Sequence, residues 1–98
     1  MQELGTFRIA ADHPALPGHF PGHPIVPGVV LLDEVLALVL VVYPGLAAGL
    51  PQMKFLRPVL AEQIVTVSAK PKAADRVDVW ASVDGQNVLR GSLSLGVS

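Results

Sequence analysis

An apolar run in the middle of the chain, Val29–Val42, limits what this 98-residue sequence can fold into more than any other stretch. Pro27 lies where the first residue of a helix would, and Gly28 follows it. Tyr43, with a Pro-Gly pair after it, ends the run. The many valines would also suit a strand, but the length and the proline favour a helix. Apolar residues stand on all sides of this helix, so we expect the protein to enclose it.

Two adjacent acids, Asp33 and Glu34, interrupt the run. They point about 100° apart on a helix, so at most one of them faces a given pocket. Asp33 shares a face with Val29, and Glu34 does not. A salt bridge to Arg57 or Lys54 is the structural alternative for either acid, and we favour it for Glu34. For Asp33, burial among apolar residues would keep the carboxyl protonated and able to give a proton.

Alternating apolar and polar residues predict strands on both sides of the helix. The later runs indicate an antiparallel meander that includes a hairpin. A sheet whose one face covers a long helix is an α+β architecture, and we expect residues 1–98 to form a single domain of this kind. The expected strands are Thr6–Ala11, Gln52–Leu56, Ile64–Lys70, Arg76–Val83 and Val88–Val97, with a turn at Asp84–Asn87.

Composition limits the partners and the location of the protein. Hydrophobic residues make up 51% of the chain and charged residues 15%, so we expect a subunit interface or a ligand tunnel to cover part of the apolar surface. The net charge of −1 and the lack of a basic run argue against a nucleic-acid partner. There is no cysteine, no segment that resembles a signal peptide, and no apolar run of the roughly 20 residues that a bilayer requires. We therefore expect a cytoplasmic protein without a membrane partner.

The segment before the helix, residues 12–28, holds five prolines and three glycines. Prolines fix φ, so this loop is stiffer than a simple connection requires. A histidine held in it, His19, titrates near neutral pH and could act as a general base. For His13 and His23 we favour a structural explanation, a surface position or a hydrogen bond to a backbone carbonyl.

Three groups could together carry chemistry: His19 as a base, Asp33 as an acid, and the Gly28 N–H as an oxyanion donor. Gly28 has no Cβ, so a substrate could approach its N–H closely, and free N–H groups at a helix N-terminus stabilise a developing oxyanion. Beside an apolar helix, this set suits removal of a proton α to a thioester carbonyl with loss of a β-hydroxyl. No metal or organic cofactor is expected, because the thioester itself acidifies the α-proton.

The stretch Gly18–Val29, GHFPGHPIVPGV, resembles the active-site signature of the hot-dog-fold 3-hydroxyacyl-[acyl carrier protein] dehydratases. In that family the first His of HFPG is the catalytic base, which implies this role for His19. The resemblance also implies an acid partner fourteen positions later on the central helix, which is Asp33. Met53–Val59, MKFLRPV, is similar to the family's KFRRPV segment. The resemblance covers residues 6–70 clearly and the remaining strands by pattern.

The resemblance implies a hot-dog fold, in which an antiparallel sheet wraps around one long central helix, and dimers or higher homo-oligomers whose sheets join. Each active site would combine His19 of one chain with Asp33 of the other, beside an acyl tunnel. The partner would be an acyl carrier protein whose phosphopantetheine arm enters past basic residues. Arg57, Lys54 and Arg90 are the candidates for this contact, although simple solvated charges are the better explanation for any one of them.

The chain departs from the family at several points. It is short before the first strand, and Glu34 stands where the family usually has a small residue. The family's helix often continues with Ala, Met and Gln, whereas this one continues with Val35–Leu38. These features resemble short dehydratases of specialised acyl or polyene pathways. Asp33 is the acid of the family branch that also isomerises the double bond, so this second activity stays open.

The leading hypothesis is a dehydratase that converts a (3R)-hydroxyacyl thioester on acyl carrier protein into the trans-2-enoyl thioester, in fatty-acid or polyene-like synthesis. His19 would remove the α-proton, the Gly28 N–H would stabilise the thioester oxygen, and Asp33 would protonate the departing hydroxyl. One alternative is a hot-dog acyl thioesterase, which needs an acid and water at the helix but no base in the loop. Another is a non-catalytic acyl-binding or scaffold subunit.

Overall fold

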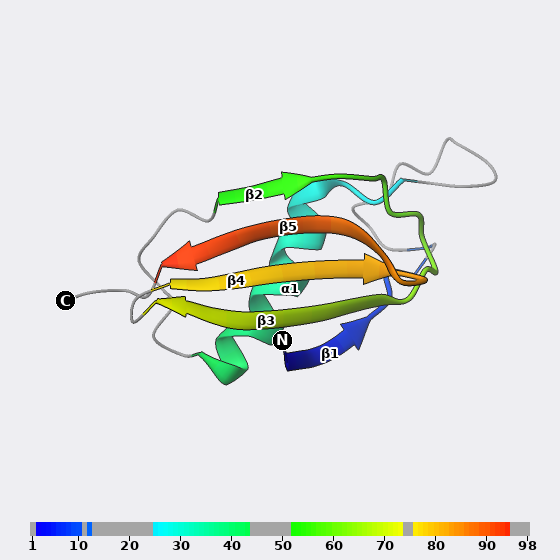
Figure 1. Cartoon of the computed structure of the whole chain (residues 1–98). Coiled ribbons are helices and arrows are strands. Elements are labelled where there is room, and N and C mark those ends of the chain that lie inside the picture. Colours follow the sequence, from blue (N-terminus) through cyan, green and yellow to red (C-terminus); the bar gives the residue numbers. More distant parts are fainter. Residues whose placement is uncertain (1, 11, 13–24, 44–51, 74–75, 95–98) are drawn as a thin grey trace.

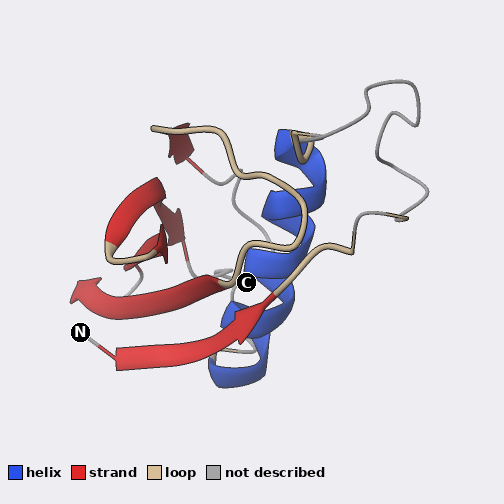
Figure 2. Ribbon diagram, turned by 90° about the vertical axis from the view of Figure 1, so that its right-hand side faces the viewer, coloured by secondary structure: helices blue, strands red, loops and turns tan. Residues whose placement is uncertain are grey.

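One helix lies against one face of a five-stranded antiparallel sheet, as the α+β prediction requires (Figures 1 and 2). The computed structural model describes residues 2–10, 12, 25–43, 52–73 and 76–94. The strand order is β1-β3-β4-β5-β2, so β1 and β2 form the two edges. The elements are β1 (Gln2–Phe7), α1 (Gly28–Val42), β2 (Gln52–Phe55), β3 (Val65–Ala73), β4 (Arg76–Val83) and β5 (Gln86–Ser94).

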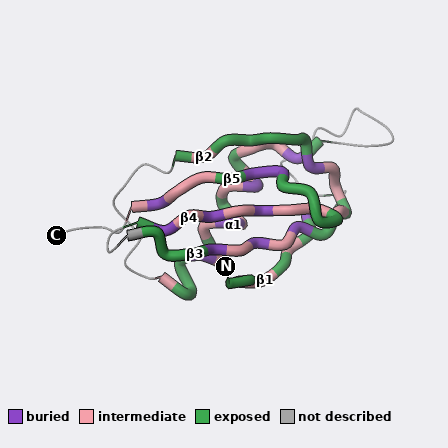
Figure 3. Tube along the Cα trace, viewed as in Figure 1, coloured by how far each residue is buried: buried purple, intermediate pink, exposed green. Residues whose placement is uncertain are grey.

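The core lies between α1 and the sheet. Burial alternates along residues 65–69 of β3 and 77–81 of β4, which appears as alternating colours in Figure 3. From the helix, Val35 and Val39 are fully buried and Leu31 nearly so. These helix residues lie about one turn apart and pack on the buried face of the sheet, to which every second residue of a strand points. Each spacing follows from the geometry of its backbone. The buried strand residues are Val65, Val67, Ala69, Val77, Val79, Ala81, Val88, Leu89 and Leu93.

The opposite face of α1 is uncovered in the described part of one chain, so the expected enclosure of the helix needs more than its own sheet. Val29 is 66% exposed and Val41 80% exposed. One sheet can cover only one side of a helix, and these apolar residues need another partner. The helix begins at Gly28, one residue after its predicted start, because Pro27 (φ −59°, ψ 143°) is the flanking N-cap residue. No helix in the described ranges is long and apolar enough to cross a membrane.

Strand boundaries differ most from the sequence prediction at β1 and at the end of β3. The first strand is Gln2–Phe7 and not Thr6–Ala11, because its ladder with β3 ends at the pair Phe7–Val65. Strand β3 also continues past Pro71, where we expected it to stop. Its register with β4 shifts between Pro71 and Ala73, so a bulge accommodates a residue that cannot donate a backbone hydrogen bond.

The β4–β5 hairpin has a tighter turn than predicted, because Gln86 already belongs to β5. Its two connecting residues, Asp84 and Gly85, have φ of 51° and 80°. A two-residue Asp-Gly loop with both φ positive matches the right-handed twist of the flanking strands. The turn sets the pairs Val83–Gln86 and Ser82–Asn87, and a register shift between Ala81 and Ser82 then places Leu89 opposite Ala81 in the core.

The close packing of edge strand β2 depends on Gly91 of β5, which is the cross-strand partner of Met53 in β2. A Cβ added at Gly91 would overlap the Gln52 carbonyl oxygen and lie 2.8 Å from Met53 Cα. Atoms of the backbone cannot yield as a flexible side chain can, so only glycine lets β2 approach β5 this closely.

We therefore expect Gly91→Ala to lower the free energy of unfolding by about 1–3 kcal/mol, the cost of overpacking. Urea unfolding measures this change. Ser92→Ala, one position away, should stay within about 0.5 kcal/mol of wild type. Equal stability of the two variants would contradict the close approach of β2 to Gly91.

Candidate active site at the start of the helix

The structure places two of the three predicted site residues. Gly28 and Asp33 lie on α1, whereas His19 lies outside the described residues, as do His13 and His23. The role of His19 therefore stays a prediction. No group of three His, Cys, Asp or Glu residues within the described ranges could hold a metal ion.

Gly28 is the first residue of α1, at an end fixed by backbone hydrogen bonds. The Pro27 carbonyl accepts hydrogen bonds from the N–H groups of Val30 (3.0 Å) and Leu31 (3.2 Å). Just before the helix, the Val26 N–H donates to the Val59 carbonyl at 2.8 Å. The Gly28 N–H precedes the first intrahelical bonds and has no acceptor within the helix. The start of α1 thus presents a fixed donor.

A groove of about 380 Å³ opens beside this helix start. The Phe55 ring lies over Gly28: a Cβ added there would be 3.1 Å from Phe55 Cζ and 3.3 Å from Cε1. The glycine therefore makes room for an aromatic ring of the same chain, a reason that sequence reasoning missed. The signal was the Phe of the KFLRPV segment, read there only as a strand residue. The lining residues are Val26, Gly28, Leu31, Phe55, Leu56, Arg57, Pro58 and Val59.

Backbone hydrogen bonds hold the segment after β2 in place along this groove. The N–H groups of Leu56 and Arg57 both donate to the Val88 carbonyl, at 2.8 Å and 3.4 Å. Phe55 (47% exposed) and Leu56 (39% exposed) extend the apolar surface beyond the groove. The wall facing Gly28 is therefore apolar and partly open to the surroundings.

Asp33 is exposed, contrary to the expected burial. It lies one helical turn from Val29 on the uncovered face of α1, and about 7.5 Å along the helix axis from Gly28. The described residues of one chain therefore do not bury this carboxyl among apolar side chains. A second chain packed on the same face would supply them.

Glu34 points to a different side of the helix, as predicted, and is half-buried. Its expected salt bridge to Arg57 or Lys54 is absent. Within the described ranges, the structure records one ion pair, between Arg8 and Glu62 at 3.5 Å. Nothing in the structure explains why an acid occupies position 34.

The three candidate basic residues separate into two groups. Arg57 lines the groove with Gly28. Lys54 and Arg90 pair across β2 and β5 and line a different hollow, on the sheet face away from the helix. Sequence reasoning could not separate them, because the pairing of β2 with β5 decides which residues are neighbours.

Because Gly28 contacts the Phe55 ring, we expect the effect of Gly28→Ala on the free energy of unfolding to change sign when the ring is removed. Gly28→Ala should be destabilising in the wild-type background, because the new Cβ presses on the ring. In a Phe55→Ala background the same change should be neutral or stabilising, by up to about 1 kcal/mol, since alanine favours the helix. Chemical denaturation of the four proteins measures both steps. Equal costs in the two backgrounds would show that the ring and the glycine do not interact.

Solved structures share this fold. The dehydratase heterocomplex ApeI:P from Xenorhabdus doucetiae superposes with a TM-score of 0.75 at 20% identity, over 94% of this chain and 84% of that one. An uncharacterised protein from Erwinia carotovora subsp. atroseptica gives 0.73 at 23% identity, over 93% and 79%. These likenesses confirm the predicted hot-dog architecture.

Curated relatives agree with this likeness. The 3-hydroxyacyl-[acyl-carrier-protein] dehydratase FabZ of Hydrogenobaculum sp. (strain Y04AAS1) is 29% identical over 92% of this chain and 71% of its own length. The FabZ of Ruminiclostridium cellulolyticum is 27% identical, over 93% and 73%. The family model described as ApeI-like, ApeI dehydratase, matches residues 2–92. The predicted resemblance to 3-hydroxyacyl-[acyl carrier protein] dehydratases is thereby confirmed, and the chain belongs to the ApeI-like family of dehydratases.

Proposed function

We propose that the protein dehydrates a (3R)-hydroxyacyl thioester carried on acyl carrier protein, giving the trans-2-enoyl thioester. Membership of a dehydratase family supports the reaction class. The observation that carries the site is the position of Asp33, an exposed acid on an apolar helix face that its own sheet leaves uncovered. That face is half of a site, and a second chain is needed to complete it.

The second half is a second copy of the same chain. The uncovered surface includes Val29, Val41, Phe55 and Leu56, all at least 39% exposed. Apolar patches of this kind are rare on monomers, and a two-fold dimer would bury both copies at once. Each active site then takes His19 from one chain and Asp33 from the other, beside the groove at Gly28. The cytoplasm is the proposed location of this dimer.

The proposed chemistry is an elimination with two proton transfers. His19 takes the proton from the carbon next to the thioester, and the electrons left behind develop negative charge on the thioester oxygen. The Gly28 N–H, at the positive end of α1, stabilises that oxygen. The bond to the β-hydroxyl then breaks, and Asp33 supplies the proton that turns the leaving hydroxyl into water. A proton passed from His19 back to Asp33 restores both groups.

Mixed dimers test the shared site directly. His19→Ala and Asp33→Asn should each lower kcat by about 10²–10⁴-fold, because each removes one proton transfer. When the two inactive proteins are unfolded and refolded together, half of the dimers are mixed, and each mixed dimer holds one intact site. Activity should recover to roughly a quarter of wild type. Mass spectrometry of the intact thioester reads the loss of one water.

Two outcomes of this experiment would contradict the proposal. If the mixture stays inactive while mixed dimers are present, His19 and Asp33 act within one chain. If the wild-type product is a free acid, the protein is a thioesterase. Mixing either variant with itself is the control for the refolding step.

The oxyanion role of Gly28 can be tested by removing its N–H. Proline is tolerated at the first position of a helix, and Pro27 already has the extended backbone that precedes a proline. Gly28→Pro should lower kcat by about 10²–10³-fold, as loss of one oxyanion donor does. Gly28→Ala adds the same Cβ beside Phe55 but keeps the N–H, so it is the matched control. If the two variants had equal kcat, the Gly28 N–H would have no part in the mechanism.

A further inference from the structure

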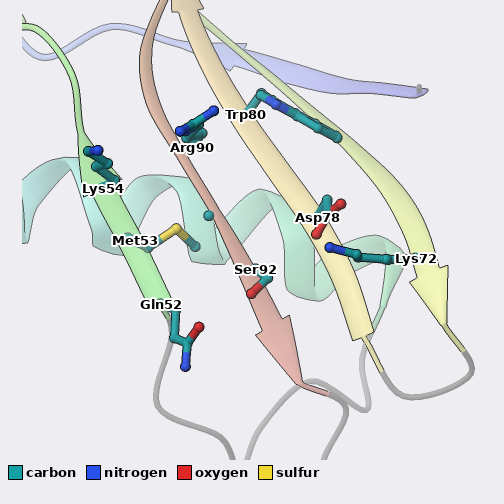
Figure 4. Close-up of a pocket in the computed structure, with 9 residues that line it drawn as sticks. Gln52, Met53, Lys54, Lys72, Asp78, Trp80, Arg90 and Ser92 are labelled. Carbon is teal, nitrogen blue, oxygen red and sulfur yellow. The ribbon is translucent and has the colours of Figure 1, made fainter.

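Phe55 of β2 belongs to the wall of the groove beside Gly28 and is not a core residue. Figure 4 shows its neighbour Lys54 among the residues of the hollow on the outer face of the sheet, with α1 behind the strands. Successive strand residues point to opposite faces, so Phe55 points toward the helix. Its cross-strand partner Leu89 is fully buried, yet Phe55 is 47% exposed. Core packing alone therefore does not account for a large ring at this position.

The ring is held in a fixed place against Gly28. The three heavy atoms nearest to a Cβ added there all belong to the far edge of the Phe55 ring: Cζ at 3.1 Å, Cε1 at 3.3 Å and Cε2 at 3.4 Å. Pairing with Leu89 fixes the backbone of Phe55 itself. The next residue is fixed by the hydrogen bond from the Leu56 N–H to the Val88 carbonyl, at 2.8 Å. An apolar edge thus lies beside the donor that the proposed mechanism uses.

An oxyanion donor at Gly28 activates a bound thioester for two different reactions. Its hydrogen bond to the thioester oxygen stabilises the charge that develops when the α-proton is removed. It equally stabilises the charge that develops when water attacks the carbonyl carbon. In that hydrolysis the water oxygen bonds to the carbon, the carbon–sulfur bond breaks, and a proton of the water passes to the sulfur, which leaves a free acid and a thiol. The donor cannot discriminate between the two reactions, so the surroundings of the carbon must.

An apolar wall provides this discrimination, because an ordered water needs roughly two to four polar partners. Among the described residues that line the groove, Arg57 is the one with a polar side chain. In the proposed dimer a second chain covers the open side of the groove, and the Phe55 ring fills the side toward β2. Truncation of the ring to a methyl group would open space for more than one water, each of which occupies about 30 Å³.

We propose that Phe55 determines the reaction specificity of the site by keeping water away from the thioester carbon bound at Gly28. The substrate then loses its hydroxyl as water and keeps its bond to the carrier. The inference rests on the proposed dehydratase function and adds to it a residue that suppresses hydrolysis of the same thioester. Exclusion of water from an active site is a recognised way to prevent such side reactions.

A series of side chains of decreasing size at position 55 measures the partition between the two reactions. Each protein receives a 3-hydroxyacyl thioester of pantetheine, and mass spectrometry quantifies free acid and enoyl thioester in the same sample after subtraction of the enzyme-free reaction. The ratio of free acid to enoyl thioester should stay near wild type in Phe55→Leu, rise in Phe55→Val, and rise by about tenfold or more in Phe55→Ala. Loss of folded protein or of dimer lowers both products together, so a purely structural role does not change this ratio.

Leu56→Ala is the matched control. Leu56 lines the same groove and is 39% exposed, but none of the three atoms nearest to Gly28 belongs to it. Its product ratio should stay within about twofold of wild type. A saturated acyl thioester, which has no β-hydroxyl to lose, provides a second readout. Phe55→Val and Phe55→Ala should hydrolyse it faster than wild type, and Leu56→Ala should not.

Two results would overturn the proposal: a ratio that does not rise from Phe55→Leu through Phe55→Val to Phe55→Ala, or an equal rise in Leu56→Ala. If Phe55→Ala does not fold, the comparison of the leucine and valine variants still decides. A wild-type protein that forms no enoyl thioester would contradict the proposed function instead. The saturated thioester would then still show whether the Phe55 ring keeps water from a carbonyl at Gly28.

Discussion

The packing of α1 onto one face of the sheet is the interaction on which the remaining structure depends. Val35 and Val39 of the helix are fully buried against a sheet face made of Val65, Val67 and Val79. Burying each such side chain contributes about 1.5–3 kcal/mol, so a few of them outweigh the local preferences of short strands. Because the sheet covers one side of the helix, this packing also determines which side stays open.

In the proposed function, the open side of the helix supplies part of the site. Gly28 is held at the start of α1 by hydrogen bonds to Pro27 and by the Phe55 ring that fills the space a side chain would need. Asp33 stands on the uncovered face a little farther along. If the core had buried all of the apolar helix surface, no apolar surface would have remained for the second chain and the acyl group of the proposed function. The incomplete coverage is therefore a property of the fold that the proposed function uses.

The two faces of the sheet carry different features. The inner face supplies the core and, at the end of β2, the groove at Gly28. The outer face carries the hollow around Trp80. Strand β2 joins them, because successive residues point to opposite faces: Phe55 contributes to the groove and Lys54 to the hollow.

The sequence alone determined the α+β class, the helix after Pro27, the strand Arg76–Val83 and the family. These features have local causes, since periodicity, proline and an Asp-Gly turn act over a few residues. The signature at residues 18–29 also singled out Asp33 and Gly28 before any contact was known. The position of His19 and its pairing with Asp33 remain predictions.

Tertiary structure decided what depends on neighbours distant in sequence. Pairing with β3 defines the first strand as Gln2–Phe7, and a bulge allows β3 to continue past Pro71. The exposure of Asp33 depended on which side of the helix the sheet covers. The glycine at position 28 is explained by Phe55, and Lys54 meets Arg90 only through the pairing of β2 with β5. No local pattern encodes these contacts, because each arises when segments far apart in the chain pack together.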